Sequence, residues 1–130
     1  MTFLREHESQ VYALLRIVTG FLFLWHGVQK VIGFPPSPPP PADVPATIIA
    51  IITWIAGPIE LVGGTLVMIG LFTRPAAFLS SGLMAVAYWM AHGTQALLPI
   101  QNGGEPAAIY CFVFLYIAAR GAGPWSVEGS

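Results

Sequence analysis

Residues 11–34 read VYALLRIVTGFLFLWHGVQKVIGF, a run made almost entirely of apolar side chains. An α-helix needs about 20 apolar residues to cross the hydrocarbon core of a bilayer, so this run predicts a membrane-spanning helix. Its last third is unusual, because His26, Gln29 and Lys30 fall within one short stretch. Ionisable groups at membrane depth are costly and mark a site or a partner.

The rest of the chain has the same character. The sequence has 130 residues, of which 55% are hydrophobic and 8% charged, whereas a soluble domain has roughly 25% charged residues. Further apolar stretches cover about residues 46–72, 75–98 and 105–120. We therefore expect an all-α integral membrane protein, a four-helix transmembrane bundle that forms a single membrane domain over residues 1–130.

A proline-rich connector separates the first two spans. Residues 35–45 contain seven of the twelve prolines. Because proline lacks an N–H group and fixes φ, this connector should be irregular or polyproline II-like and lie outside the hydrocarbon. Pro58, inside the second span, should kink that helix.

Several classes of protein are disfavoured. The net charge of -1 and the lack of a basic cluster argue against nucleic acid binding. A single cysteine, Cys111, and no CxxC motif argue against a self-contained thiol oxidoreductase. The first apolar run is longer than the core of a signal peptide, so we expect it to be retained.

The basic residues predict an orientation in the membrane. Arg5, Arg16, Arg74 and Arg120 lie toward one side of the spans, and Lys30 lies toward the other. The positive-inside rule then places both termini in the cytoplasm, for a multi-pass protein of the inner (plasma) membrane. Arg16 is close enough to the inner edge to snorkel to it.

Glu60 is the polar residue that most strongly indicates a site or a partner within the membrane. With a rise of about 1.5 Å per residue, His26 lies about 20 Å and Glu60 about 16 Å from the cytoplasmic edge, so they can meet. Glu60 should be neutral, or paired with His26 or Lys30, because a charge there costs at least about 2.5–3.5 kcal/mol. Two interpretations are open, a functional site and a structural ion pair between closely packed helices.

Other polar residues share this outer half. His26 and Lys30 are four residues apart and share a helix face, although Lys30 alone is typical of a snorkelling cation. His92 lies one turn above Tyr88, and an interfacial belt with Trp89 is the alternative to a site. Tyr110 is expected to be a packing or interface residue, and lining the slot of an aromatic ligand is the alternative.

A short repeat connects two spans. The sequence HGVQ at residues 26–29 recurs as HGTQ at residues 92–95. Duplication of a two-helix hairpin is one explanation and chance is the other.

Three segments together resemble a known family. They are LLRIVTGFLFLWHGVQKVIGF, GPIELVGGTLVMIGLFTRPAA and AHGTQALLPIQNGGEPAAIYCFVFLYIAARGAGPWSVE, and they are similar to the DoxX family of small bacterial and archaeal membrane proteins. The resemblance implies a four-helix membrane bundle associated with redox processes. Some members are similar to membrane subunits of thiosulfate:quinone oxidoreductase, and others appear in responses to quinones and thiol-directed oxidants.

The resemblance also carries over individual residues. The matching motif positions are Arg16, His26, Gln29, Lys30, Glu60, His92, Asn102 and Glu105. The family's tail often ends in Asp where this chain has Glu128, and the proline-rich connector is unusual for the family.

We expect a quinone-linked membrane component of a redox or oxidative-stress system. Glu60, His26 and His92 are the candidate catalytic residues, and a further set is expected to bind ligand: Arg16, Gln29, Lys30, Tyr88, Asn102 and Glu105. Quinone is the expected cofactor, and electrons would come from a redox partner protein. If the chain is part of an enzyme, it is a subunit of a quinone-dependent oxidoreductase.

Other functions and ligands remain open. One is a proton-coupled transporter or channel for a small solute, which would need a homo-oligomer, and another is a non-catalytic scaffold for a redox enzyme. A haem held by His26 and His92, or a zinc ion held by these and Glu60, are further alternatives. The zinc ligands lack a local spacing signature, and we expect no metal, haem or nucleotide. The expected partners are the lipid bilayer and a redox protein.

Overall fold

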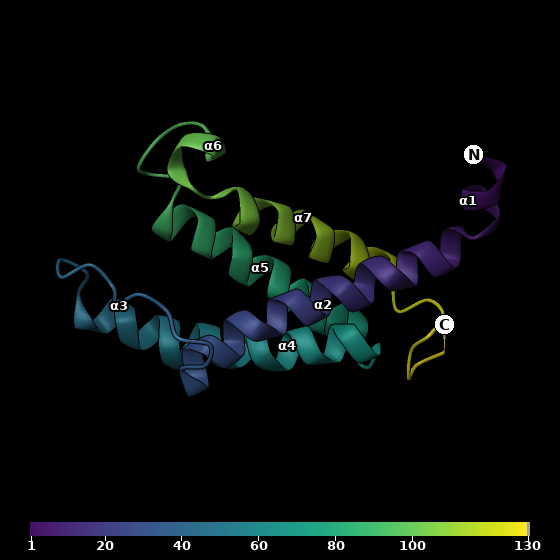
Figure 1. The fold of residues 1–130 in the computed structure, drawn as a ribbon, viewed down its shortest axis with the longest axis horizontal. Helices are drawn as coiled ribbons and strands as arrows, with labels where there is room; N and C mark the ends of the chain where they lie inside the picture. Colours follow the sequence, from purple (N-terminus) through teal and green to yellow (C-terminus); the bar gives the residue numbers. More distant parts are fainter. Residues whose placement is uncertain (130) are drawn as a thin grey trace.

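The computed structural model describes residues 1–129, and it contains helices and loops but no strand in that range. This confirms the all-α class. The elements, shown in Figure 1, are α1 (Thr2–Glu6), α2 (Glu8–Ile32), α3 (Ala46–Ile51), the π-helix η1 (Ile52–Ala56), α4 (Gly57–Ile69), α5 (Thr73–Ala91), α6 (Pro99–Asn102) and α7 (Glu105–Arg120).

Two helical segments are long and apolar enough to cross a membrane. They are Glu8–Ile32 and the continuous run Ala46–Ile69. Large apolar side chains are also exposed on the outer faces of all four long segments, among them Phe21, Trp54, Phe78 and Phe112. Exposed apolar surface on this scale is typical of a protein that faces lipid.

The long helices pack in pairs. α2 packs against α4 and α5 against α7, while α4 also contacts α5. Successive long helices run in opposite directions, so both termini lie at one end of the bundle (Figure 1). The proline-rich connector, α3 and α6 lie toward the other end.

Glycines allow the backbones of α2 and α4 to touch. A Cβ atom on Gly20 would lie 2.6 Å from the carbonyl oxygen of Gly64, and one on Gly27 would lie 2.7 Å from that of Gly57. The two glycines of each helix are seven residues apart, two turns, so they share one face. Any side chain at these positions would separate the helices.

Aromatic packing joins the two pairs of helices. The rings of Phe23 on α2 and Phe114 on α7 have centroids 4.6 Å apart, and Tyr110 lies 5.2 Å from Phe23. Phe23 and Phe114 are almost fully buried. This contact sets how α7 lies against α2.

Prolines and glycines explain where the helices differ from the expected spans. Pro58 cannot donate the N–H group that would bond one turn back, and the turn before it is the π-helix η1. α5 ends at Ala91, before the expected boundary at residue 98, and Leu98 is extended ahead of Pro99. α2 and α4 end at Gly33 and Gly70, which adopt left-handed backbone.

Arg16 is buried and holds the C-terminal tail, so the expectation that it snorkels to the membrane edge is wrong. Its side chain has no exposed surface. Nε donates to the Val67 carbonyl at 3.1 Å, Nη1 to Pro124 at 2.9 Å and Nη2 to Trp125 at 2.6 Å. Nη1 also donates to Ala122. The tail folds back over α2 and supplies acceptors, so the guanidinium does not need to reach water.

The end of the tail also joins α4 to α5. Val127 and Glu128 donate their N–H groups to the carbonyls of Ile69 and Gly70 at 2.9 and 3.0 Å. The Glu128 carboxylate in turn accepts the N–H of Thr73 at 2.7 Å. Glu128 therefore caps α5, a helix more than fifty residues away in sequence.

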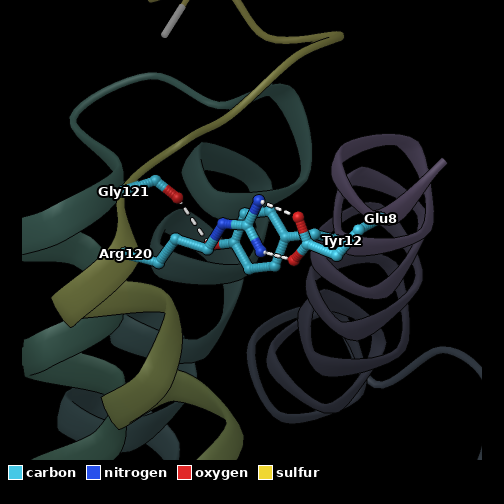
Figure 2. Close-up of polar contacts among 4 residues, drawn as sticks. All are labelled: Glu8, Tyr12, Arg120 and Gly121. Carbon is cyan, nitrogen blue, oxygen red and sulfur yellow. Dashed lines mark hydrogen bonds and ion pairs between the residues drawn. The ribbon is translucent and has the colours of Figure 1, made fainter. Parts of the chain in front are cut away.

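A cluster of four residues ties the start of α2 to the end of α7. Figure 2 shows Glu8 paired with Arg120, and the Tyr12 hydroxyl donating to the Gly121 carbonyl at 2.5 Å. The Arg120 guanidinium also lies 4.1 Å from the centre of the Tyr12 ring. An ion pair, a cation–π contact and a hydrogen bond to backbone therefore hold α2 against α7 where the tail begins.

The glycine contact between α2 and α4 can be tested with Gly27→Leu. We expect the free energy of unfolding in detergent to fall by about 3 kcal/mol or more, because the new side chain overlaps α4 backbone. Gly82→Ala is the control, since a Cβ there meets nothing within 4 Å. Equal stability of Gly27→Leu and the wild type would contradict the close packing.

The role of Arg16 can be tested with Arg16→Gln. The substitution removes donors from the tail carbonyls, so we expect carboxypeptidase to trim residues 121–129 much faster and stability to fall by about 3 kcal/mol. Arg5→Gln, at an exposed arginine of α1, should change neither quantity. Unchanged trimming of Arg16→Gln would show that the tail is held by other contacts.

Candidate functional site

The polar centre of the α2/α4 pair is an ion pair. The Lys30 ammonium donates to Oε1 and Oε2 of Glu60 at 2.6 and 2.7 Å. The Glu60 side chain is 2% exposed and that of Lys30 is 28% exposed. The expectation that Glu60 is paired is thus confirmed with Lys30 as the partner, and the pair is reached from outside through the lysine.

Local structure explains why these two side chains meet. Lys30 lies in the last turn of α2, and Glu60 lies in the first turn of α4, just after Pro58. α3, η1 and α4 form one continuous helical run, so Glu60 lies inside that run and faces Lys30 near the end of α2. A Cβ on Gly57 would lie 3.1 Å from that of Lys30, so the absence of a side chain lets α2 approach at this level.

His26 lies one turn before Lys30 on the same face, beside an aromatic residue of α7. Its ring centroid is 6.0 Å from that of Tyr110, edge to face at 84°. His26 is exposed, and Tyr110 is half-buried with its other side against Phe23 and Phe114. Tyr110 was expected first as a packing residue and is not among the predicted site residues, because nothing in the spacing of α7 indicates which side chain faces α2.

Tyr88, His92 and Asn102 form a separate polar group. His92 Nδ1 lies 2.9 Å from the Asn102 carbonyl oxygen. The Asn102 amide donates to the Tyr88 hydroxyl and to the Ala96 carbonyl, both at 3.1 Å, and its oxygen accepts from Gly104 at 2.8 Å. These contacts close the loop between α5 and α7.

The remaining expected site residues lie apart. Gln29 donates to the carbonyls of Pro35 and Pro36 at 3.0 and 3.5 Å and holds the start of the connector. Glu105 is exposed at the first position of α7. Arg16, on α2, bonds to carbonyls of the tail at the opposite end of the bundle. Within residues 1–129, no hydrogen bond or ion pair links His92 to Lys30 or Glu60.

The Lys30–Glu60 pair can donate a hydrogen bond to a ligand. A lysine ammonium has three N–H groups, and the contacts to Glu60 use two of them. One N–H group therefore remains, and the His26 imidazole lies one turn away on the same helix, with its ring edge to face with that of Tyr110 on α7. Among the described residues, no three His, Cys, Asp or Glu side chains gather as a metal site would require.

Two cavities lie elsewhere on the molecule. One is an apolar groove of 270 Å³ between α4 and α5, lined by Pro58, Ile59, Val62, Gly63, Leu66, Ala76 and Leu79. The other, of 360 Å³, lies where α5 begins and the tail ends. Neither of them includes Lys30 or Glu60.

Comparison with known proteins identifies the family. The DoxX family matches residues 11–93. A relative from Haemophilus influenzae (strain ATCC 51907 / DSM 11121 / KW20 / Rd), described as an uncharacterized protein, is 37% identical over 131 aligned positions, which cover 98% of this chain and 96% of the relative. No solved structure matches the chain. The match to more than half of the chain shows that this protein belongs to the DoxX family.

Proposed function

We propose that the chain is a quinone-linked membrane component of a redox system, and that the quinone head group binds beside the Lys30–Glu60 pair. One observation carries the proposal. A carboxylate that is 2% exposed is paired with a lysine that is 28% exposed, within helices whose outer faces are apolar. Such a pair is expensive in a membrane and marks a functional site unless it serves only as glue.

The donors around the pair suit a quinone. A quinone presents carbonyl oxygens, and the Lys30 ammonium, the His26 imidazole and the Tyr110 hydroxyl can each donate to one. Reduction to the quinol also needs two protons. His26 would donate one, and Glu60 would take up the other from the Lys30 ammonium and pass it to the quinone, with Lys30 reprotonated from water. The prenyl tail would follow exposed apolar side chains such as Trp25 and Trp54. A redox partner protein would supply the electrons.

A non-catalytic scaffold is the second candidate. The observation that favours it is that Arg16 and the Tyr88–His92–Asn102 group bond to the chain's own atoms. These residues fasten loops and helices without a ligand. In a scaffold, Lys30 and Glu60 would do the same for α2 and α4.

We also propose that the chain is one membrane domain with four spans in the inner membrane and both termini in the cytoplasm. The support is the position of the charges. Arg5, Arg16, Arg74 and Arg120 lie on segments at the end that carries both termini (Figure 1), and Lys30 lies toward the other end. α5 and α7, with 19 and 16 residues, are about 28 and 24 Å long.

The quinone site can be tested by tryptophan quenching of the purified protein with ubiquinone and menaquinone analogues. We expect saturable quenching, with affinity reduced at least about tenfold in Glu60→Gln and in His26→Ala, since each loses a charged or donor group. Glu6→Gln, at an exposed carboxylate of α1, is the matched control and should bind as the wild type does.

Thermal unfolding of the same samples separates the two candidates. Lower stability of Glu60→Gln with unchanged quenching would favour the scaffold. Wild-type affinity in both Glu60→Gln and His26→Ala would contradict the quinone site.

The topology can be tested by cysteine labelling in intact cells. In a chain carrying Cys111→Ala, a membrane-impermeant maleimide should label Ser37→Cys in the connector. It should label Glu6→Cys only after the cells are permeabilised. The reverse pattern would place the termini outside the cytoplasm.

A further inference from the structure

The end of the bundle that carries the termini has a cavity that the proposed quinone site does not use. Its volume is 360 Å³, and it is lined by Leu71, Phe72, Thr73, Arg74, Pro75 and Glu128. The 19-residue helix α5 begins here. Its first turn brings the positive end of the helix dipole to the cavity; the Thr73 N–H group there is bonded to Glu128, and Pro75 has no N–H group.

Thr73 is only partly satisfied in this position. Its N–H group donates to the Glu128 carboxylate at 2.7 Å. Its hydroxyl oxygen is buried and has no hydrogen-bond partner among the described residues, and the whole residue is 0% exposed. Native structures rarely leave a buried hydroxyl without a partner, so this wall of the cavity lacks an acceptor for the hydroxyl proton.

Arg74 adds positive charge to the same wall. Its Nη1 donates to the carbonyls of Ala118 and Ala119 at 3.1 and 2.5 Å, and Nη2 donates to Arg120 at 3.2 Å. A guanidinium has five N–H groups, so Nε and one hydrogen of Nη2 remain free. When the Glu128 carboxylate moves aside, the N–H group and hydroxyl of Thr73 become available beside Arg74, at a helix N-terminus, a position that favours bound anions.

We propose that the N-terminus of α5 binds a phosphate group, and that the Glu128 carboxylate is the chain's own occupant of this site. A phosphate carries more acceptor oxygens than the single carboxylate oxygen that now contacts Thr73, so it can satisfy both the N–H group and the hydroxyl of that residue. Glu128 is exposed near the end of the tail and can move aside. The phosphate comes from a phospholipid head group or from free phosphate, and this inference does not depend on the quinone proposal.

Calorimetric titration of the full chain in detergent tests the site with three probes. They are inorganic phosphate, a short-chain phosphatidylglycerol, and the matching diacylglycerol, which lacks phosphate. Thr73→Val keeps the side-chain shape and should weaken phosphate binding about tenfold, because one hydrogen bond to a charged group is lost. Glu128→Gln should tighten binding several-fold, because the competing charge is removed.

A threonine outside the cavity provides the control for Thr73→Val. Thr65→Val removes a hydroxyl that bonds to the Leu61 carbonyl on α4 and should bind phosphate as the wild type does. Binding of both phosphate probes supports the site for either source, and binding of only one of them identifies the source. The opposite effects of the two site variants distinguish loss of the site from loss of folding. The proposal is overturned by no binding of either phosphate probe, by equal binding of diacylglycerol, or by unchanged affinity in both site variants.

Discussion

The close contact between the backbones of α2 and α4 is the constraint on which the rest of the structure depends. Gly20 and Gly27 on one helix face Gly64 and Gly57 on the other, and a Cβ atom on Gly20, Gly27 or Gly64 would overlap the backbone of the partner helix. Because the helices touch, the Lys30 ammonium reaches both oxygens of Glu60 and the buried carboxylate is paired. A wider separation would leave that charge without its partner in an apolar environment, which is far costlier than the pair.

At the other end of the bundle, the C-terminal tail provides the partners for a buried charged side chain. The Arg16 side chain carries a buried charge, and carbonyl groups of the tail accept its hydrogen bonds, as water would at a surface. The tail then crosses to α4 and caps α5 with Glu128. The resemblance to the DoxX family marks an acidic residue at this position, and the structure gives it a physical task, since a carboxylate is the preferred partner of a helix N-terminus.

The candidate site could be predicted from the sequence only in part. The cost of burying Glu60 and the shared face of His26 and Lys30 follow from helix geometry, and the structure places a Lys30–Glu60 pair there. The expectation that His92 joins His26 and Glu60 in one cluster rested on their similar depth in the membrane. Depth alone cannot establish contact, because residues at one depth can lie on different sides of a bundle. His92 bonds within its own loop, while Tyr110, which spacing does not single out, faces His26.

The sequence by itself determined the all-α class, the apolar segments and the irregular proline-rich connector between α2 and α3. These features are local, since helix periodicity, apolar length and the φ preferences of glycine and proline act within a few residues. Only the tertiary structure decided that Lys30 is the partner of Glu60, that Arg16 is buried beneath the tail and that Glu128 caps α5. Those contacts join segments 30 to more than 100 residues apart, so they depend on how the helices rotate and pack against one another.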